Sequence, residues 1–237
     1  MKISLIIPMY NESKIIANTA KELDVYMREN FEEYEVVFSD DGSKDGSAKI
    51  VEDLCLSNVR VVGYGENRGK GCAVRHAMLT ADGDVRIFTD ADLAYGTAVI
   101  KTAYDMMCAD PSADMVIGSR NVGKDGYEGY TLLRKIMSKV YIKVLCITGG
   151  FKLSDSQCGF KAFRGNTTNE IFSKCKVDGF AFDFEAILWA TRLEKKIKEM
   201  PVKIINHRES SIRPFRDTVK MLGDLRRIKK DVKKSSL

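Results

Sequence analysis

Residues 85–92 read Val-Arg-Ile-Phe-Thr-Asp-Ala-Asp, and this stretch decides how the rest of the sequence is interpreted. An apolar run that leads directly into two carboxylates, Asp90 and Asp92, is typical of a buried strand with acidic side chains at its end. Mg²⁺ and Mn²⁺ bind carboxylate oxygens and complete their coordination with water or substrate phosphates. The stretch therefore predicts a metal site for a diphosphate, although Asp is also common where a strand simply turns.

Strand-like and helix-like segments alternate around this stretch. Apolar runs predict strands at residues 2–8, 35–39, 58–63, 85–89 and 114–118, with amphipathic helices between them. Alternation of this kind is typical of a mostly parallel, doubly wound α/β sheet of the Rossmann type, whose ligands bind beyond the carboxyl ends of the strands. The polar residues that follow these predicted strand ends are Asn11, Asp40, Asp90, Asp92 and Arg120.

The loop after the first predicted strand has no glycine between residues 9 and 14. Both the dinucleotide-binding fingerprint and the P-loop place glycines at this point, so the sequence argues against an NAD-dependent enzyme and against an ATPase.

Composition limits the class of protein further. The chain has 237 residues, 44% of them hydrophobic, and no apolar run long enough to span a bilayer, so we expect a cytoplasmic globular protein. Its six cysteines form no Cys-x-x-Cys pair, which favours reduced thiols over a disulfide framework or a zinc site. The net charge of +5 comes from the end of the chain, because residues 213–237 hold nine Lys/Arg and three Asp/Glu. No basic patch with interleaved aromatics predicts nucleic-acid binding.

Two loops carry further candidate ligand-binding residues. Gly69-Lys70-Gly71 precedes a predicted helix, so backbone N–H groups, the helix dipole and an ammonium could all face a phosphate, although glycines also allow tight turns. Asp40 follows the second strand, where a carboxylate can accept hydrogen bonds from a ribose or a base. Its neighbours Asp41 and Asp45 are either further ligands or turn-forming residues.

Several motifs, taken in order, resemble the family 2 glycosyltransferases. They are IPMYNE, DDGSKDGS, ENRGKGCAVR, DADLAYG, GSR, DSQCGFKAFR and FAFDFEAI, and they cover roughly residues 3–225. The resemblance is greatest to the dolichyl-phosphate β-glucosyltransferases, followed by mannose synthases and bacterial polyprenyl-phosphate glycosyltransferases. It implies a GT-A fold and an inverting transferase that uses a nucleotide-diphospho-sugar.

The resemblance also implies roles for individual residues. Asp90 and Asp92 would bind Mg²⁺ or Mn²⁺, with Asp90 also close to the donor. The other residues expected around the nucleotide-sugar are Pro8, Tyr10, Asn11, Glu12, Asp40, Lys70 and Arg75. Those expected to contact an acceptor phosphate are Arg120, Arg134 and Ser138, and arginine suits this role because it binds phosphate oxygens bidentately.

Residues 130–147 predict an amphipathic helix with apolar positions at helical spacing and four cations among them. This helix could lie on a membrane surface or pack its apolar side on the domain core.

Asp155 and Asp183 are the candidate catalytic carboxylates. A sugar hydroxyl needs a general base, whereas a phosphate monoester is largely dianionic at neutral pH and needs cations and positioning. With a phosphate acceptor, Asp155 would orient groups or act as a weak base. Asp183 is either a catalytic base or a negative charge that stabilises the N-terminus of a helix. Cys158 has no histidine beside it, which favours a packing role over a nucleophilic one.

We expect a glycosyltransferase domain over residues 1–212, a strand within 196–205, and a basic amphipathic helix or tail over 213–237. The tail either anchors the protein on anionic lipid or docks on the domain. His207 is a weak candidate for the metal shell.

The hypothesis from sequence is a peripheral enzyme on the cytoplasmic face of a membrane. It would transfer a hexose, with glucose from UDP-glucose favoured, to a polyprenyl or dolichyl phosphate. Two alternatives remain: transfer to a sugar hydroxyl of a glycan, and a non-catalytic module that binds nucleotide-sugars. The choice between UDP and GDP, between glucose and mannose, and the oligomeric state stay open.

Overall fold

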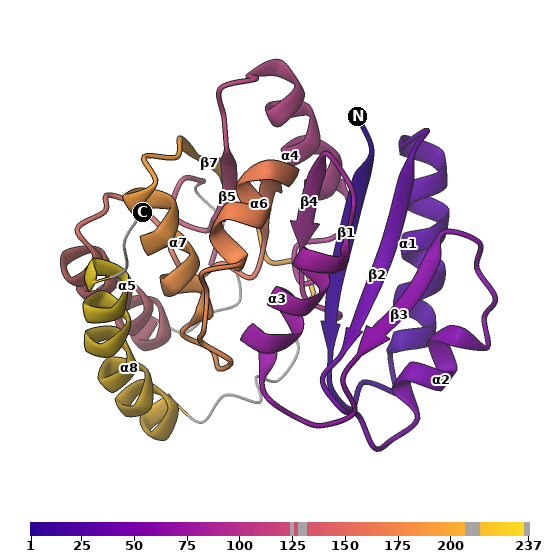
Figure 1. Cartoon of the computed structure of the whole chain (residues 1–237), viewed down its shortest axis with the longest axis horizontal. Helices are drawn as coiled ribbons and strands as arrows, with labels where there is room; N and C mark the ends of the chain where they lie inside the picture. Colours follow the sequence, from indigo (N-terminus) through magenta and orange to yellow (C-terminus); the bar gives the residue numbers. More distant parts are fainter. Residues whose placement is uncertain (124–125, 128–131, 207–213, 235–237) are drawn as a thin grey trace.

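The computed structural model describes residues 1–123, 126–127, 132–206 and 214–234, apart from the side chains of 133, 134 and 214–223. Helices and strands alternate through most of the chain (Figure 1). They are β1 (Ile3–Met9), α1 (Ile16–Asn30), β2 (Tyr34–Asp40), α2 (Ser47–Glu52), β3 (Val59–Gly63), α3 (Lys70–Thr80), β4 (Val85–Phe88), α4 (Ala98–Ala109), β5 (Met115–Ser119), α5 (Leu132–Gly149), β6 (Lys161–Arg164), α6 (Gly165–Phe172), α7 (Phe182–Arg192), β7 (Ile197–Pro201) and α8 (Pro214–Lys234).

The strands form one sheet in the order β3-β2-β1-β4-β6-β5-β7. All pairs are parallel except the two that involve β6, which runs antiparallel between β4 and β5. The predicted mostly parallel α/β sheet is therefore confirmed. Neither β6 nor α6 was predicted, because a four-residue strand is too short to show a period.

The strand bounds differ from the prediction at two prolines. β1 continues one residue beyond Pro8, to Met9. β7 ends at Pro201 instead of continuing to 205. Beyond Pro201 the chain leaves the ladder, and the backbone N–H groups of Ile205 and Asn206 donate to the carbonyl of Ala94.

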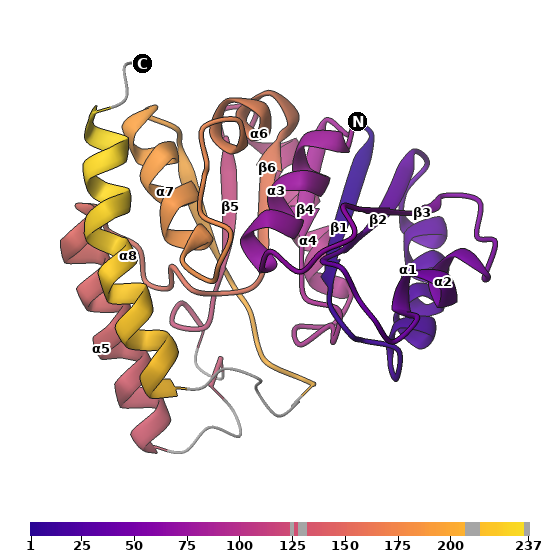
Figure 2. The ribbon, with the colours of Figure 1, turned by 60° about the horizontal axis from the view of Figure 1, so that its bottom comes forward.

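Two apolar cores lie on the two faces of the sheet. Side chains alternate along β1, so Leu5 joins the core under α1 and α4, whereas Ile6 joins the core under α3 and α7. Every residue of β1 is buried, as expected for the middle of a sheet covered on both sides. The turned view in Figure 2 shows α5 and α8 side by side beyond α7.

The described part of the last helix bears on an alternative that the sequence left open. Leu225, Ile228 and Val232 of α8 are buried in the core that also contains α7. These three side chains dock on the domain and are not available to a membrane. Among the residues that the structure describes, no helix combines the length and apolar character needed to cross a bilayer.

Candidate active site

The carboxyl ends of β1, β2 and β4 meet at one edge of the sheet. Met9 pairs with Asp40 in the β1–β2 register, and the N–H of Asp41 donates to the carbonyl of Met9. Asn11 follows in a left-handed conformation (φ 54°), and its side-chain oxygen accepts a hydrogen bond from the N–H of Lys44. The loops after these strands therefore brace one another at the edge where a doubly wound sheet binds its ligands.

The residues predicted to hold the nucleotide differ in how far they are exposed. Tyr10 is 43% exposed, whereas Pro8 lies within β1, buried with the rest of the strand. The backbone N–H of Glu12 donates to the hydroxyl oxygen of Ser47, and the carboxylate of Asp40 accepts the N–H of Ser43. Tyr10 and Asn11 of the first loop are thus exposed at this edge, and Asp40 at the end of β2 is half-buried.

Asp41 is a structural residue that shapes the glycine-rich loop. Its buried carboxylate accepts hydrogen bonds from the hydroxyl of Tyr64 (2.5 Å) and the amide of Asn67 (2.9 Å). It also accepts the backbone N–H groups of Arg68 and Gly69. One buried carboxylate therefore fixes the loop that leads into α3. Asp45 similarly accepts the N–H groups of Ser13 and Ser47, so the turn interpretation holds for both aspartates.

Arg75 braces the base of the same loop. Its guanidinium donates to the carboxylate of Asp178 (2.5 Å) and to the carbonyl of Val177. The carbonyl of Asp178 in turn accepts the N–H of Gly71. The guanidinium of Arg75 is therefore hydrogen-bonded to the segment before α7. Its position near a diphosphate stays a prediction.

Lys70 lies at the N-terminus of α3, where its ammonium donates to Oδ1 of Asp90. Burial lowers the pKa of Lys70, but the carboxylates of Asp90 and Asp183 outweigh this effect and raise it above its usual value. The other Asp90 oxygen lies against Gly159, where an added Cβ would come within 2.4 Å of Oδ2. A lysine and a glycine together thus fix the carboxylate at the end of β4.

The two aspartates after β4 suit a divalent cation that is bound together with a diphosphate. Oδ1 of Asp92 accepts the N–H of Ala94 (3.1 Å), which closes the turn that carries both carboxylates. Within the described ranges, no three His, Cys, Asp or Glu side chains gather as a closed metal cage. A pair of carboxylates with ligand oxygens in the remaining positions is the usual arrangement for Mg²⁺ bound with phosphates. His207 lies outside the described residues.

Asp183 lies at the start of α7, buried beside a second lysine. The ammonium of Lys161 donates to Oδ1 of Asp183 (2.5 Å) and to the carbonyl of Cys158 (2.6 Å). Burial raises the pKa of Asp183 above its usual value, and the ammonium groups of Lys161 and Lys70 oppose that effect. Asp183 is thus bound in an ion pair, which does not suit a free general base.

The predicted acceptor residues gather on the other side of the edge. Arg120 forms a bidentate pair with Asp155, from Nε to Oδ2 (2.6 Å) and from a terminal nitrogen to Oδ1 (3.0 Å). Its guanidinium lies 5.3 Å from the ring centre of Tyr127, whose hydroxyl is 3.2 Å from the hydroxyl of Ser138. The side chain of Arg134 lies outside the description, four residues before Ser138 in α5. Because Asp155 is fully buried and paired with Arg120, its geometry fits an orienting role.

The chain is similar to known proteins over most of its length. Residues 4–172 match the model of glycosyl transferase family 2. The chain belongs to glycosyl transferase family 2. It is 31% identical to a dolichyl-phosphate β-glucosyltransferase of Dictyostelium discoideum, over 96% of this chain and 73% of that protein. Identity to the human dolichyl-phosphate β-glucosyltransferase is 28%, over 94% of this chain and 74% of that protein.

Solved structures of two sugar-phosphate synthases share the fold. Mannosyl-3-phosphoglycerate synthase from Rubrobacter xylanophilus matches with a TM-score of 0.72 at 17% identity, over all of this chain and 77% of that one. Glucosyl-3-phosphoglycerate synthase from Mycobacterium tuberculosis, solved with Mn²⁺, UDP-glucose and phosphoglyceric acid, matches with a TM-score of 0.71 at 16% identity, over 99% and 81% of the two chains. The GT-A fold of this glycosyltransferase is therefore established.

Several residues of this family 2 enzyme that shape the site were missed by sequence reasoning. They are Gly159, Lys161 and Glu199, and the carboxylate of Glu199 accepts the N–H groups of Ser154 and Asp155. A signal existed for two of them, because Gly159 and Lys161 belong to the DSQCGFKAFR motif. The packing role expected for Cys158 agrees with its environment, since burial raises the pKa of its thiol to about 11.

Proposed function

We propose that this glycosyltransferase moves glucose from UDP-glucose to the phosphate of dolichol or a related polyprenol. The observation that carries the proposal is the arrangement of two groups on one sheet edge. Lys70 and Asp90 form a donor side, and Arg120, Tyr127 and Ser138 form a second side next to α5. The names of the similar dolichyl-phosphate β-glucosyltransferases support the choice of sugar and acceptor.

The chemistry fits a phosphate acceptor. An oxygen of the dianionic acceptor phosphate forms a bond to the anomeric carbon of glucose while the bond from that carbon to UDP breaks, and UDP leaves with the electron pair. This single displacement inverts the anomeric centre and requires no proton transfer from the nucleophile. A divalent cation on Asp90 and Asp92 would neutralise charge on the departing diphosphate.

The residues of the chain then act as positioning groups and fixed charges. Lys70 places an ammonium at the donor diphosphate, while Arg120, held by Asp155, presents a cation to the acceptor. Because the carboxylate of Asp155 is already paired with Arg120, it is poorly placed to act as a base, which supports an acceptor that needs none.

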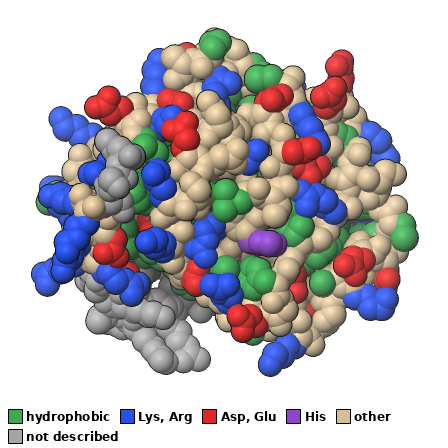
Figure 3. All heavy atoms as spheres, in the orientation of Figure 1, with side chains coloured by type: hydrophobic (Ala, Val, Ile, Leu, Met, Phe, Trp, Pro, Cys, Tyr) green, Lys and Arg blue, Asp and Glu red, His purple; other side chains and the backbone are tan. Residues whose placement is uncertain are grey.

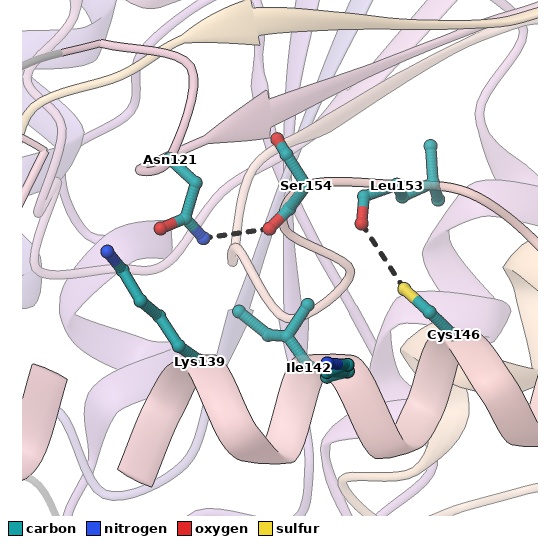
Figure 4. Close-up of a pocket in the computed structure, with 7 residues that line it drawn as sticks. Asn121, Lys139, Ile142, Cys146, Leu153 and Ser154 are labelled. Carbon is teal, nitrogen blue, oxygen red and sulfur yellow. Dashed lines mark hydrogen bonds between the residues drawn. The ribbon is translucent and has the colours of Figure 1, made fainter. Parts of the chain in front are cut away.

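A cavity beside the acceptor side offers a path for the lipid. It has a volume of about 320 Å³ and lies between α5 and the segment at 153–154. Figure 4 shows Lys139, Ile142 and Cys146 of α5 facing Asn121 and Ser154 across it. Asn121 also donates to the hydroxyl of Tyr127, so the cavity adjoins the proposed acceptor group.

The outer side of α5 is the proposed contact with the membrane, on its cytoplasmic face. This helix has no acidic residue, and its exposed apolar side chains are Leu132, Ile136, Met137, Val140, Val144 and Ile147. Lys and Arg side chains gather at the edge of the molecule near α5 and α8, on the left of Figure 3. An exposed apolar stripe with cations beside it is typical of an interfacial helix.

The test is a radiolabelled transfer assay with UDP-glucose and GDP-mannose. Each donor is offered to a short-chain polyprenyl phosphate in detergent with Mg²⁺ or Mn²⁺, and the matched control acceptor is the polyprenol without its phosphate. We expect label in the lipid phase only with UDP-glucose and the phosphate, and none with the Asp92→Ala variant. Metal-dependent donor turnover without lipid label would contradict the lipid-phosphate acceptor and favour a glycan hydroxyl.

A further inference from the structure

Lys161 is a fully buried lysine, and the proposed reaction mechanism gives it no role. It is the first residue of β6 and pairs with Phe88 at the end of β4, directly under the segment that carries Asp90. Its ammonium contacts the carbonyl of Cys158 and the carboxylate of Asp183, and lies 5.4 Å from the ring centre of Phe88. An isolated buried charge is very costly, and each of these contacts offsets part of the cost of burying the ammonium of Lys161.

The pair formed by Lys161 and Asp183 continues to the donor side. The start of α3 lies against the start of α7, because an added Cβ at Gly71 would come within 2.7 Å of Cβ of Phe182. Lys70 and Asp183, the neighbours of these two residues, interact electrostatically. The Lys70 ammonium also donates a hydrogen bond to Asp90. The exposed fraction of the side chain is 0% for Lys161 and 10% for Asp183. It is 24% for Lys70 and 33% for Asp90. Charges therefore alternate from the core to the donor side of the site, and these four side chains together have no net charge.

We propose that Lys161 is a positioning residue for donor binding: it holds Asp183 in place as a carboxylate, and Asp183 in turn holds the Lys70 ammonium at the diphosphate. This inference rests on the proposed function, because it assumes that Lys70 faces a nucleoside diphosphate. It gives Asp183 an electrostatic role in place of the base role considered from sequence.

The physical reason lies in what Asp183 does without its buried partner. A buried carboxylate that has lost its cation either takes up a proton or draws in the nearest remaining cation. The first outcome removes the anion that faces Lys70, and the second pulls Lys70 away from Asp90. Both displace the ammonium from the place where the diphosphate is expected.

The test is a double-mutant cycle on UDP affinity, measured by calorimetry with Mn²⁺. The variants are Lys161→Met, Lys70→Met and the two combined. We expect Lys161→Met to weaken UDP binding about tenfold or more, the loss typical of a charge-assisted contact. In the Lys70→Met background the same change should weaken binding by less than about twofold, because the residue through which Lys161 acts is already absent.

Equal losses of UDP affinity in both backgrounds would overturn the inference, since they would mean that Lys161 does not act through Lys70.

The matched control is Arg86→Met, which removes another buried cation, from β4. This change should lower stability without changing the UDP affinity of the folded protein. If Lys161→Met does not fold, Lys161→Met with Asp183→Asn removes the buried charges together. Weak UDP binding by this folded variant supports the inference, and affinity like that of the wild type overturns it.

The same measurement separates this inference from the proposed function. A wild-type protein that binds neither UDP nor GDP with Mn²⁺ would overturn both. Normal wild-type binding with independent effects of Lys161 and Lys70 would overturn the positioning role alone.

Discussion

Replacing Gly159 with alanine should disable the donor side of the site without unfolding the protein. The new Cβ would lie 2.4 Å from Oδ2 and 3.2 Å from Cγ of Asp90, whereas ordinary contact begins at 3.4 Å. The Asp90 carboxylate must therefore retreat by about 1 Å, the difference between 3.4 and 2.4 Å. Its other oxygen receives the Lys70 ammonium, so this contact is displaced as well.

The expected magnitude follows from this shift. A displacement of about 1 Å in a catalytic group can lower turnover about 100-fold. The free energy of unfolding should fall by only about 1 kcal/mol, because the crowded atom belongs to a side chain on the edge of the site. The backbone at Gly159 does not require a left-handed conformation, so no strain is added there.

The assay compares kcat for glucose transfer and the Mn²⁺ concentration for half-maximal activity between the variant and the wild type. Gly179→Ala is the matched control, because an added Cβ at Gly179 meets nothing within 4 Å. We expect kcat to fall only in Gly159→Ala, with a weaker response to Mn²⁺. A Gly159→Ala enzyme within about twofold of the wild type in both quantities would refute the role assigned to Asp90.

Four further predictions test other parts of the molecule. Asp41→Ala should lower the free energy of unfolding, measured in urea, by about 2–4 kcal/mol, because it removes the charged acceptor of hydrogen bonds from Tyr64, from Asn67 and from the backbone at 68–69. Arg134→Ala should lower kcat/KM for polyprenyl phosphate at least about tenfold while the KM for the donor stays unchanged; a loss confined to the donor KM would contradict its acceptor role. Val140→Glu, in the exposed stripe of α5, should reduce association with anionic vesicles about tenfold in a flotation assay, whereas Val25→Glu, exposed on α1, should not. With a pKa of about 11, Cys158 stays protonated between pH 7 and pH 9, so mass spectrometry should find it unmodified by iodoacetamide after the exposed thiols have reacted.

The sequence predicted those parts of the site that follow directly from a strand. Asp90 comes straight after an apolar run, and Lys70 lies between two glycines before a helix, so local pattern was enough to place both. Alternation of strands and helices predicted that Asp90 lies at the carboxyl edge of the sheet. Only the family resemblance implied that Lys70 lies near the same nucleotide-sugar. The structure joins the two residues by a hydrogen bond.

The roles of the two candidate bases could not be decided in the same way. Asp155 pairs with Arg120 across 35 residues, and Asp183 pairs with Lys161 across 22. Neither spacing has a local signature, because each pair is formed by separate elements that meet only when the sheet is complete.

The amino-acid sequence by itself determined the alternation of helices and strands, the sheet edge at which the candidate site lies and the motifs that resemble the family to which the chain belongs. Periodicity and turn chemistry act over a few residues, and these features depend on nothing longer. The tertiary structure decided that β6 enters antiparallel between β4 and β5, which brings Lys161 beneath Asp90 and Gly159 against it. It also decided that Leu225, Ile228 and Val232 of α8 are buried while α5 exposes an apolar stripe. Both helices are amphipathic, and only the space left on the domain surface determines which of them is covered.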